Sequence, residues 1–484
     1  MGALSLRELA TAAGAAALSG LVMLGAGHKL GTATALFVPL ALVLVVVLLM
    51  RPVLAVSLTA FSAILVEGEA FGLFTFAQNF YHPLYKHLTP LDALVVLAVL
   101  AVALDMLRDR RAPIYPRELR LPHMILALAM VSGVVVGHAS GVSTKSAVLA
   151  ENVWSYLVLL PLAVANLRVD MARLQWLLGA AFALAVLKGF LGVAEIASGK
   201  GVSIEGSATL TYYEPTANWV VMVALLGVFA ALLARWRPPL WMLLGTPLLI
   251  ASLVLSYRRS FWIATVLGLL LVLLLALSPV GRRLLIPTAL ILAAAIWLLG
   301  SINFQSQSPI VKRAASLNPT SLTTNIEDRY RLDERANVLA ELRRHPITGL
   351  GVLVPWSASA RPLPVEHENG REYVHFVALY WWLKLGILGL LAYPALLIAS
   401  ALMAWRVWHQ HGPPIVRAFG LASLCGIAGL LAAETTASFT GVDLRFTTVF
   451  GTQIGLLALL SRMTSQAPGE GDEGPAPAPA GLHG

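Results

Sequence analysis

The chain has 484 residues, of which 58% are hydrophobic and only 12% are charged, and its formal net charge is +9. An ordinary soluble domain carries roughly 25% charged residues, so this composition excludes a soluble enzyme. The positive charge by itself would fit nucleic-acid binding, but the Lys and Arg residues lie mostly in short loops between apolar blocks. There they set membrane topology, and we therefore expect no nucleic-acid partner.

The apolar blocks are long enough to cross the roughly 30 Å of bilayer hydrocarbon as helices. They predict an all-α polytopic membrane protein with about 14 transmembrane helices, within a range of about 12 to about 14. In chain order the expected spans are residues 9–27, 33–50, 52–66, 91–107, 121–138, 148–166, 174–197, 216–234, 239–255, 260–277, 284–300, 373–403, 416–437 and 444–461. The single cysteine, Cys425, lies inside one of them, so no disulfide forms within one chain.

The distribution of basic residues between the loops predicts the orientation. With a cytoplasmic N-terminus, arginine-bearing loops such as those at Arg51 and Arg283 lie inside. The outer loops before residue 216 then hold only Lys29, Lys86, Lys145 and Lys200. This asymmetry follows the positive-inside rule, so we expect both chain ends in the cytoplasm and a location in an inner membrane.

Four regions follow from this topology. Residues 1–300 are expected to form transmembrane helices, and 301–372 a long periplasmic loop. Residues 373–463 are expected to form three C-terminal transmembrane helices. The segment 464–484 is rich in Pro, Gly and Ala, with too little apolar content to fold, and predicts a disordered cytoplasmic tail.

Within the long loop, the sequence predicts one surface helix over residues 325–344. A capping-box pattern at Thr324–Glu327 opens it, and apolar residues then recur at helical spacing as far as His345. The helix carries many charges of both signs, which is typical of a solvated face with i,i+4 pairs such as Glu327 with Arg331. A glycine-bearing turn follows at residues 346–351 and lets the backbone approach another group closely.

Two polar positions border the loop on the same side of the membrane. His375 lies where the loop re-enters the membrane, and it is either a polar anchor or a proton acceptor. Arg258 and Arg259 lie at a span end on the side that the positive-inside rule disfavours. They either extend to lipid phosphates or bind a diphosphate, for which guanidinium groups are well suited.

The sequence offers no convincing metal or nucleotide site. Glu366, His367 and Glu368 have the ligand types for a metal, but three consecutive residues rarely converge on one ion. No Asp-x-Asp, Walker or Gly-x-Ser-x-Gly sequence is present. We therefore expect neither a metal nor a cofactor, and we exclude a nucleotide-sugar glycosyltransferase of the metal-dependent kind, an ATPase and a common esterase.

Three elements of residues 250–403 occur in an order and spacing that resemble the O-antigen ligase and polymerase superfamily. The first is Arg331 followed by Pro346-Ile-Thr-Gly349-Leu-Gly351, similar to that family's Arg and later Pro-x-x-Gly-x-Gly. The second is His375 followed by Gly386 and Gly389, and the third is the Ser256–Trp262 segment with its arginines. Three features depart from the family pattern: Phe376 stands where Asn is usual, Lys384 stands where an acidic residue is common, and the loop preceding Asn218 lacks an obvious arginine.

The resemblance implies a membrane glycosyltransferase that acts at the periplasmic face. It would move a glycan from a polyprenyl-diphosphate carrier to a hydroxyl of lipid A core or of another glycan, with inversion and without a metal. It implies that His375 is the catalytic base and that Arg258, Arg259 and Arg331 bind the diphosphate. Secondary candidates are Lys86, Gly349, Gly351 and Lys384.

Two alternatives stay open from the sequence. Within the superfamily, a polysaccharide polymerase or a protein O-oligosaccharyltransferase shares the same motifs. In a different class, a lipid-linked glycan flippase has a similar number of helices. A flippase predicts short loops on both faces and functional charges at mid-membrane, whereas this sequence concentrates its charges at one interface beside a long loop.

Overall fold

The computed structural model describes residues 32–66, 80–81, 89–199, 202–204, 208–210, 215–233, 236–276, 326–364 and 370–465. Within these ranges the regular secondary structure is helical apart from one short antiparallel hairpin, which pairs β1 (Val202–Ile204) with β2 (Ala208–Leu210). The all-α prediction therefore holds except for this hairpin, which the sequence analysis did not foresee.

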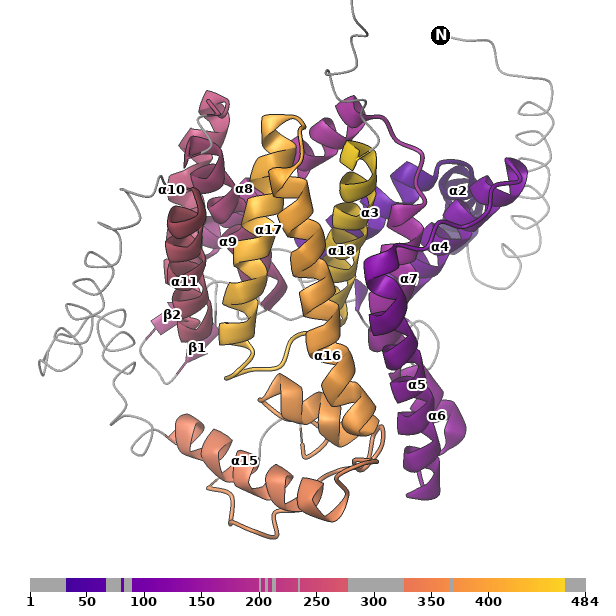
Figure 1. Ribbon diagram of the computed structural model, residues 1–484, viewed down its shortest axis with the longest axis vertical. Coiled ribbons are helices and arrows are strands. Elements are labelled where there is room, and N and C mark those ends of the chain that lie inside the picture. Colours follow the sequence, from indigo (N-terminus) through magenta and orange to yellow (C-terminus); the bar gives the residue numbers. More distant parts are fainter. Residues whose placement is uncertain are drawn as a thin grey trace, which may run out of the picture.

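The helices follow one another from α2 to α18 (Figure 1). They are α2 (Thr32–Met50), α3 (Pro52–Leu65), α4 (Pro90–Arg108), α5 (Arg117–Ala139), α6 (Thr144–Ala150), α7 (Asn152–Ala165), α8 (Met171–Ala197), α9 (Pro215–Leu233), α10 (Leu240–Leu255), α11 (Arg259–Ala276), α15 (Ile326–Arg344), α16 (Val377–His409), α17 (Pro414–Ala433) and α18 (Leu444–Ser465).

Seven helices of the described residues are long and apolar enough to cross a membrane, or up to nine if each of two bent pairs counts as one span. The helices α10 and α11 are apolar but shorter. The chain is thus a multi-pass membrane protein, while the expected total of about 14 spans is not confirmed. Two expected spans, 9–27 and 284–300, lie outside the described residues.

Bends alter three of the expected spans. Residues 33–50 and 52–66 correspond to α2 and α3, which meet at 118° and form a broken span or a re-entrant loop instead of two independent spans. Pro52 at the start of α3 explains the break, because proline has no N–H to continue the ladder of α2. Residues 148–166 form two helices, α6 and α7, bent by 47° at Glu151.

Close packing of long helices positions the rest of the fold. The helix α16 packs along α5 and α17, and α18 packs along α7 (Figure 1). Lys188, which the sequence places inside a span, is fully buried in α8, and its ammonium group donates to the Leu65 carbonyl at 3.4 Å. A buried charge of this kind needs such a partner in a membrane interior.

The predicted surface helix is confirmed as α15, which begins and ends within one residue of the expected bounds. It lies across one end of the bundle (Figure 1). Val338 and Leu342 on its buried face pack with Trp356, Val374 and Leu383 in a separate hydrophobic cluster. This cluster fixes α15 against the loop and against the first turns of α16.

The turn that follows α15 packs against a bend in α16. Gly386 has φ 70° and ψ −165°, so α16 is not continuous there, contrary to the expected straight helix with Gly386 and Gly389 on one face. The Ile387 N–H donates to the Ile347 carbonyl at 2.9 Å. A Cβ atom on Gly386 would lie 2.4 Å from that same carbonyl oxygen, so only glycine admits the turn.

Candidate active site

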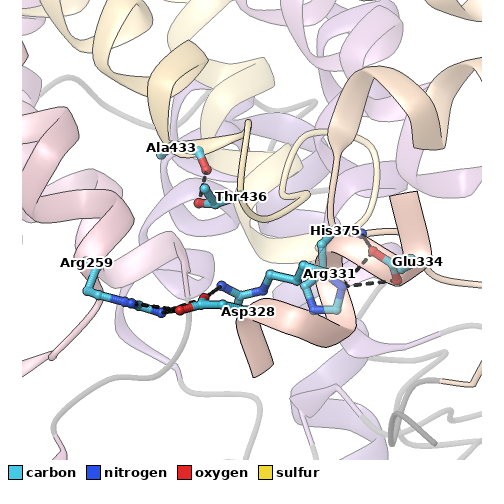
Figure 2. Close-up of polar contacts among 7 residues, drawn as sticks. All are labelled: Arg259, Asp328, Arg331, Glu334, His375, Ala433 and Thr436. Carbon is cyan, nitrogen blue, oxygen red and sulfur yellow. Dashed lines mark hydrogen bonds and ion pairs between the residues drawn. The ribbon is translucent and has the colours of Figure 1, made fainter. Parts of the chain in front are cut away.

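A buried polar pair joins α15 to the segment before α16. The carboxylate of Glu334 contacts Nδ1 of His375 at 3.0 and 3.1 Å, and it accepts a hydrogen bond from the His375 backbone N–H at 2.9 Å. Figure 2 shows the two side chains facing each other. Both are buried, with Glu334 at 0% and His375 at 7% exposure. The histidine is therefore held in a fixed orientation.

This contact indicates which ring nitrogen of His375 carries the proton. A carboxylate can only accept hydrogen bonds, so Nδ1 carries the proton in the pair. In a neutral imidazole the lone pair then resides on Nε2, which is the atom that can take a proton from a substrate.

Two tyrosine rings enclose the imidazole of His375. Tyr373 contacts it edge-on at 4.8 Å between ring centroids, and Tyr330 of α15 does so at 5.9 Å. The Tyr373 hydroxyl accepts a hydrogen bond from the Ser438 N–H at 3.3 Å. Burial raises the pKa of Tyr373 to about 12, so its ring stays neutral beside His375 at physiological pH.

A second polar group connects α11 to α15 through one carboxylate. The Arg259 guanidinium donates to Asp328 through both terminal nitrogens, at 2.8 and 3.1 Å. Arg331 contacts the same carboxylate at 3.5 Å. Two arginines against one carboxylate leave a net positive charge, and both guanidinium groups converge on one anionic group (Figure 2).

Arg258 lies next to Arg259 but takes a different direction. Its guanidinium carbon is 5.8 Å from the centroid of the Phe439 ring, in the buried loop between α17 and α18. Tyr257, just before it, has a positive φ of 51°, which is uncommon for a residue with a side chain. This backbone turns the chain sharply between α10 and α11 and directs the two arginines to different neighbours.

The helix α15 brings the acid–base pair and the arginine pair together. Asp328, Arg331 and Glu334 are spaced by three residues, so they follow one another along about 9 Å of one helix. His375 and Arg259, from other elements, contact the two ends of this row. Three of the four principal residues expected from the sequence, Arg259, Arg331 and His375, are thus gathered in one place.

Three of the secondary candidates, Gly349, Gly351 and Lys384, pack the loop after α15 against neighbouring helices. Gly349 has φ 63°, and its Cα approaches α16 so closely that a Cβ would lie 2.4 Å from the Leu383 carbonyl oxygen. Gly351, with φ 92°, meets the backbone of α5 at Gly137 in the same way. Lys384 is buried and donates to the Val354 carbonyl at 2.6 Å, so it ties the loop to α16. These residues hold the loop that carries the site.

Some sequence candidates lie outside the described residues: Lys86, the Glu366–Glu368 run and the loop segment before α15. Among the residues that the structure does describe, no group of three or more His, Cys, Asp or Glu side chains is arranged to hold a metal. An apolar cavity of about 220 Å³, lined by residues such as Leu178, Val228 and Phe419, lies toward the other end of the bundle and contains none of the site residues.

Sequence reasoning missed Asp328 and Glu334. It treated the charges of this helix as a solvated face and paired Arg331 with Glu327, whereas Asp328 and Glu334 are buried and Arg331 contacts Asp328. One signal was present in the sequence: both acidic residues are three positions from Arg331, the one residue of the helix that the resemblance had marked.

A multi-pass membrane protein with an arginine pair and a carboxylate-bound histidine at one end of its bundle is a candidate membrane transferase. Comparison with protein families is more specific: residues 244–394 match the family described as O-antigen ligase. The matched segment contains Arg259, Asp328, Arg331, Glu334 and His375, and the match supports the resemblance to the O-antigen ligase and polymerase superfamily. No curated protein sequence matches the chain.

Proposed function

We propose that this protein transfers a glycan from a polyprenyl-diphosphate carrier to an acceptor hydroxyl, with inversion at the anomeric carbon. Membership of residues 244–394 in the superfamily supports a ligase- or polymerase-type membrane enzyme. The observation that carries the proposal is the Glu334–His375 pair, held at 3.0 Å and placed one helical turn from Arg331. A general base and an anion-binding group are the two parts that such a transfer needs.

In the proposed reaction, Nε2 of His375 removes the proton of the acceptor hydroxyl as the oxygen attacks the anomeric carbon. The new C–O bond forms while the bond from that carbon to the diphosphate oxygen breaks, and the diphosphate leaves with the electron pair. Glu334 orients the His375 ring through Nδ1, in the same way that a carboxylate orients a catalytic histidine in hydrolases. The reaction involves no change of oxidation state, so it needs no oxidant or reductant.

Arg258, Arg259 and Arg331 are proposed to hold the diphosphate as its charge develops. Arginine forms two parallel hydrogen bonds with phosphate oxygens, and such contacts are strongest where water is excluded. Asp328 keeps Arg259 and Arg331 close together in the absence of substrate. A diphosphate carries more negative charge than one carboxylate, so it can use the remaining positive charge of this cluster.

The side of the membrane follows from the loop charges: we place the site at the periplasmic face, with both chain ends in the cytoplasm. For the acceptor we propose lipid A core, which makes the enzyme a ligase. A polymerase that extends another glycan, or a transferase to protein hydroxyls, uses the same groups. The departures at Phe376 and Lys384 concern the surroundings of the base and not the base itself.

A direct test uses purified protein in nanodiscs with a polyprenyl-diphosphate glycan as donor. Candidate acceptors are added separately, and both the glycan product and the released polyprenyl diphosphate are measured. The proposal requires equal amounts of product and released diphosphate with at least one acceptor. Release of diphosphate without an acceptor, in amounts equal to those with it, would show hydrolysis instead of transfer.

A further inference from the structure

The loop between α17 and α18, residues 434–443, lies at the end of the bundle that faces α15 (Figure 1). It comes after the segment 244–394 that matches the O-antigen ligase family, so the match assigns it no role. Its first residue, Glu434, falls inside the expected span 416–437, but in the structure α17 ends at Ala433. The loop that follows contacts two parts of the candidate site.

Glu434 anchors the first half of this loop. Its buried carboxylate accepts hydrogen bonds from the Phe439 N–H at 3.1 Å and from the Thr440 N–H at 2.6 Å. Its other oxygen accepts a hydrogen bond from the Tyr393 hydroxyl of α16 at 2.5 Å. The Glu434 backbone carbonyl also accepts from the N–H of Val377, the first residue of α16, at 3.3 Å. One residue therefore folds the loop back on itself and joins it to α16.

Two buried tryptophans hold the second half of the loop. The indole N–H of Trp381, in α16, donates to the Thr440 carbonyl at 2.9 Å. Gly441 has φ 75° and lies so close to Trp154 of α7 that a Cβ would be 2.4 Å from its indole nitrogen. A loop with buried contacts to two other helices opens less readily than a solvated one. Groups that bind to this loop are therefore held in a fixed position.

Ser438, near the middle of the loop, holds the peptide that leads into His375. Its hydroxyl donates to the Val374 carbonyl at 2.6 Å, and its backbone N–H donates to the Tyr373 hydroxyl at 3.3 Å. On the other side, Glu334 of α15 accepts from the His375 N–H at 2.9 Å. The backbone that carries the imidazole is therefore bound from both α15 and the loop.

The next residue of the loop, Phe439, contacts the arginine side of the site. Its ring centroid lies 5.8 Å from the guanidinium carbon of Arg258, a distance at which a cation is attracted to an aromatic ring. The same ring stacks on Phe261 of α11 at 5.3 Å between centroids, which fixes its orientation. Asp443, at the end of the loop, lies close enough to Arg258 for the two charges to interact. The loop therefore also determines where Arg258 lies.

We propose that the loop between α17 and α18 positions both parts of the site: the base through Ser438 and a donor-binding arginine through Phe439. This inference rests on the proposed function, because it names the residues that place His375 and Arg258 for that reaction. Both are positioning residues, and each acts through the group that it holds. Since they are neighbours in one anchored loop, the loop sets the separation between the base and the arginine, on which the reacting geometry depends.

Adjacent substitutions in full-length protein in nanodiscs test the two contacts separately. Ser438→Ala removes the hydroxyl that binds the Val374 carbonyl. It should lower kcat by roughly 10-fold to 100-fold without changing the KM for donor, because a base displaced by about 1 Å reacts much more slowly. Phe439→Leu keeps an apolar side chain against Phe261 but removes the ring beside Arg258. It should weaken the binding of labelled polyprenyl diphosphate by about 3-fold to 10-fold, and act mainly on the KM for donor.

Thr435→Ala is the matched control, because Thr435 is an exposed residue of the same loop whose hydroxyl donates to the nearby Ala432 carbonyl. It should behave as the unmodified protein does. Ser438→Cys should keep more of kcat than Ser438→Ala, since a thiol is still a weak donor. A merely structural role predicts that kcat, donor affinity and thermal stability fall together in Ser438→Ala and Phe439→Leu. That result would overturn the proposal, and so would wild-type kcat in Ser438→Ala or wild-type donor affinity in Phe439→Leu.

Hydrogen exchange separates this proposal from the proposed function, because it needs no turnover. Exchange at residues 373–377, followed by mass spectrometry, should be faster in Ser438→Ala than in the unmodified protein or in Thr435→Ala. If His375→Ala transfers glycan at an unreduced rate, the proposed function is wrong, while faster exchange in Ser438→Ala still shows that the loop holds this peptide. If His375→Ala is inactive but Ser438→Ala keeps wild-type kcat and exchange, the proposed function stands and the positioning assignment is wrong.

Discussion

Glu334 holds His375 through two different groups, the imidazole Nδ1 at 3.0 Å and the backbone N–H at 2.9 Å. One carboxylate thus fixes both the ring and the peptide that carries it, across 41 residues of sequence. Glu334 therefore has two roles: its oxygen accepts the backbone hydrogen bond, and its carboxylate orients the imidazole. A substitution that keeps the hydrogen-bond acceptor but removes the charge should affect catalysis more than folding.

The first prediction follows from this separation. Glu334→Gln should keep the hydrogen bond to the His375 N–H and leave thermal stability nearly unchanged. It should lower kcat by roughly 10-fold to 100-fold, as is typical for a residue that orients a functional histidine, with little change in the KM for donor. Glu334→Ala should lose activity and also stability, by about 1 to 3 kcal/mol, because it leaves a buried N–H without its acceptor. Glu334→Asp should recover part of kcat.

Measurements of kcat, KM and thermal unfolding on the three variants distinguish positioning from a purely structural role. A structural role predicts that activity follows stability in all three. Wild-type kcat in Glu334→Gln would show that the carboxylate charge is not needed.

The second prediction concerns the arginines on Asp328. Arg259→Ala and Arg331→Ala should each raise the KM for donor or lower kcat/KM by roughly 10-fold to 100-fold, since a charge-assisted hydrogen bond contributes about 1.5 to 3 kcal/mol. Lysine at either position should restore only part of this, because an ammonium group lacks the planar fork. Arg173→Ala, an exposed arginine far from α15, serves as control and should behave as the unmodified enzyme. Equal losses in all variants would indicate general damage to the protein.

The helices of this fold were largely predictable because apolar periodicity and length are local properties of a sequence. The surface helix α15 was found within one residue at each end, since its capping pattern and the His345-Pro346 stop are local too. The bend of α16 at Gly386 was not found. It depends on a tight contact with Ile347, which lies 39 positions earlier, and local sequence patterns do not reveal a contact at that separation.

The candidate site was predictable only in part, for the same reason. His375, Arg259 and Arg331 were found through their motif spacing. Asp328 and Glu334 were not, because a carboxylate among ten charged residues of a helix has the same sequence signature whether it is buried or exposed. Burial is decided by the docking of α15 on α16, which is a tertiary contact.

The third prediction tests whether Gly349 serves packing. Gly349 and Gly370 share a φ of 63°, but a Cβ would lie 2.4 Å from the Leu383 oxygen at Gly349, whereas at Gly370 it would meet none of the described residues within 4 Å. Both alanine variants incur the backbone strain of a positive φ, of order 1 to 3 kcal/mol. Only Gly349→Ala adds the clash, so it should show the larger loss of thermal stability and of folded protein in size-exclusion chromatography. Equal losses would show that the contact with α16 is unimportant.

The fourth prediction concerns membrane orientation. The break between α2 and α3 changes how many times the N-terminal part crosses, so orientation is best measured at α8 and at the loop after α15. In a Cys425→Ala background, Ser359→Cys should react with an impermeant thiol reagent in intact spheroplasts. Arg173→Cys should react only after the membrane is opened. Both positions are exposed, so accessibility differs only by side of the membrane. The reverse pattern would place the site in the cytoplasm.

The last prediction is that His375→Ala abolishes glycan transfer while the protein still folds and binds donor. The imidazole is held by Glu334 through Nδ1, so Nε2 is the ring atom that we propose accepts the proton. Removing a general base typically costs about 100-fold to 10,000-fold in rate. His375→Gln should be almost as inactive, since an amide keeps a hydrogen bond but cannot take the proton. Donor binding, measured with labelled polyprenyl diphosphate, should persist because Arg259 and Arg331 remain on Asp328. His345→Ala is the control, since His345 is exposed at the end of α15 and should keep most activity. Glycan transfer at a near wild-type rate by His375→Ala would show that another group removes the proton, and the Glu334–His375 pair would then be an anchor between α15 and α16.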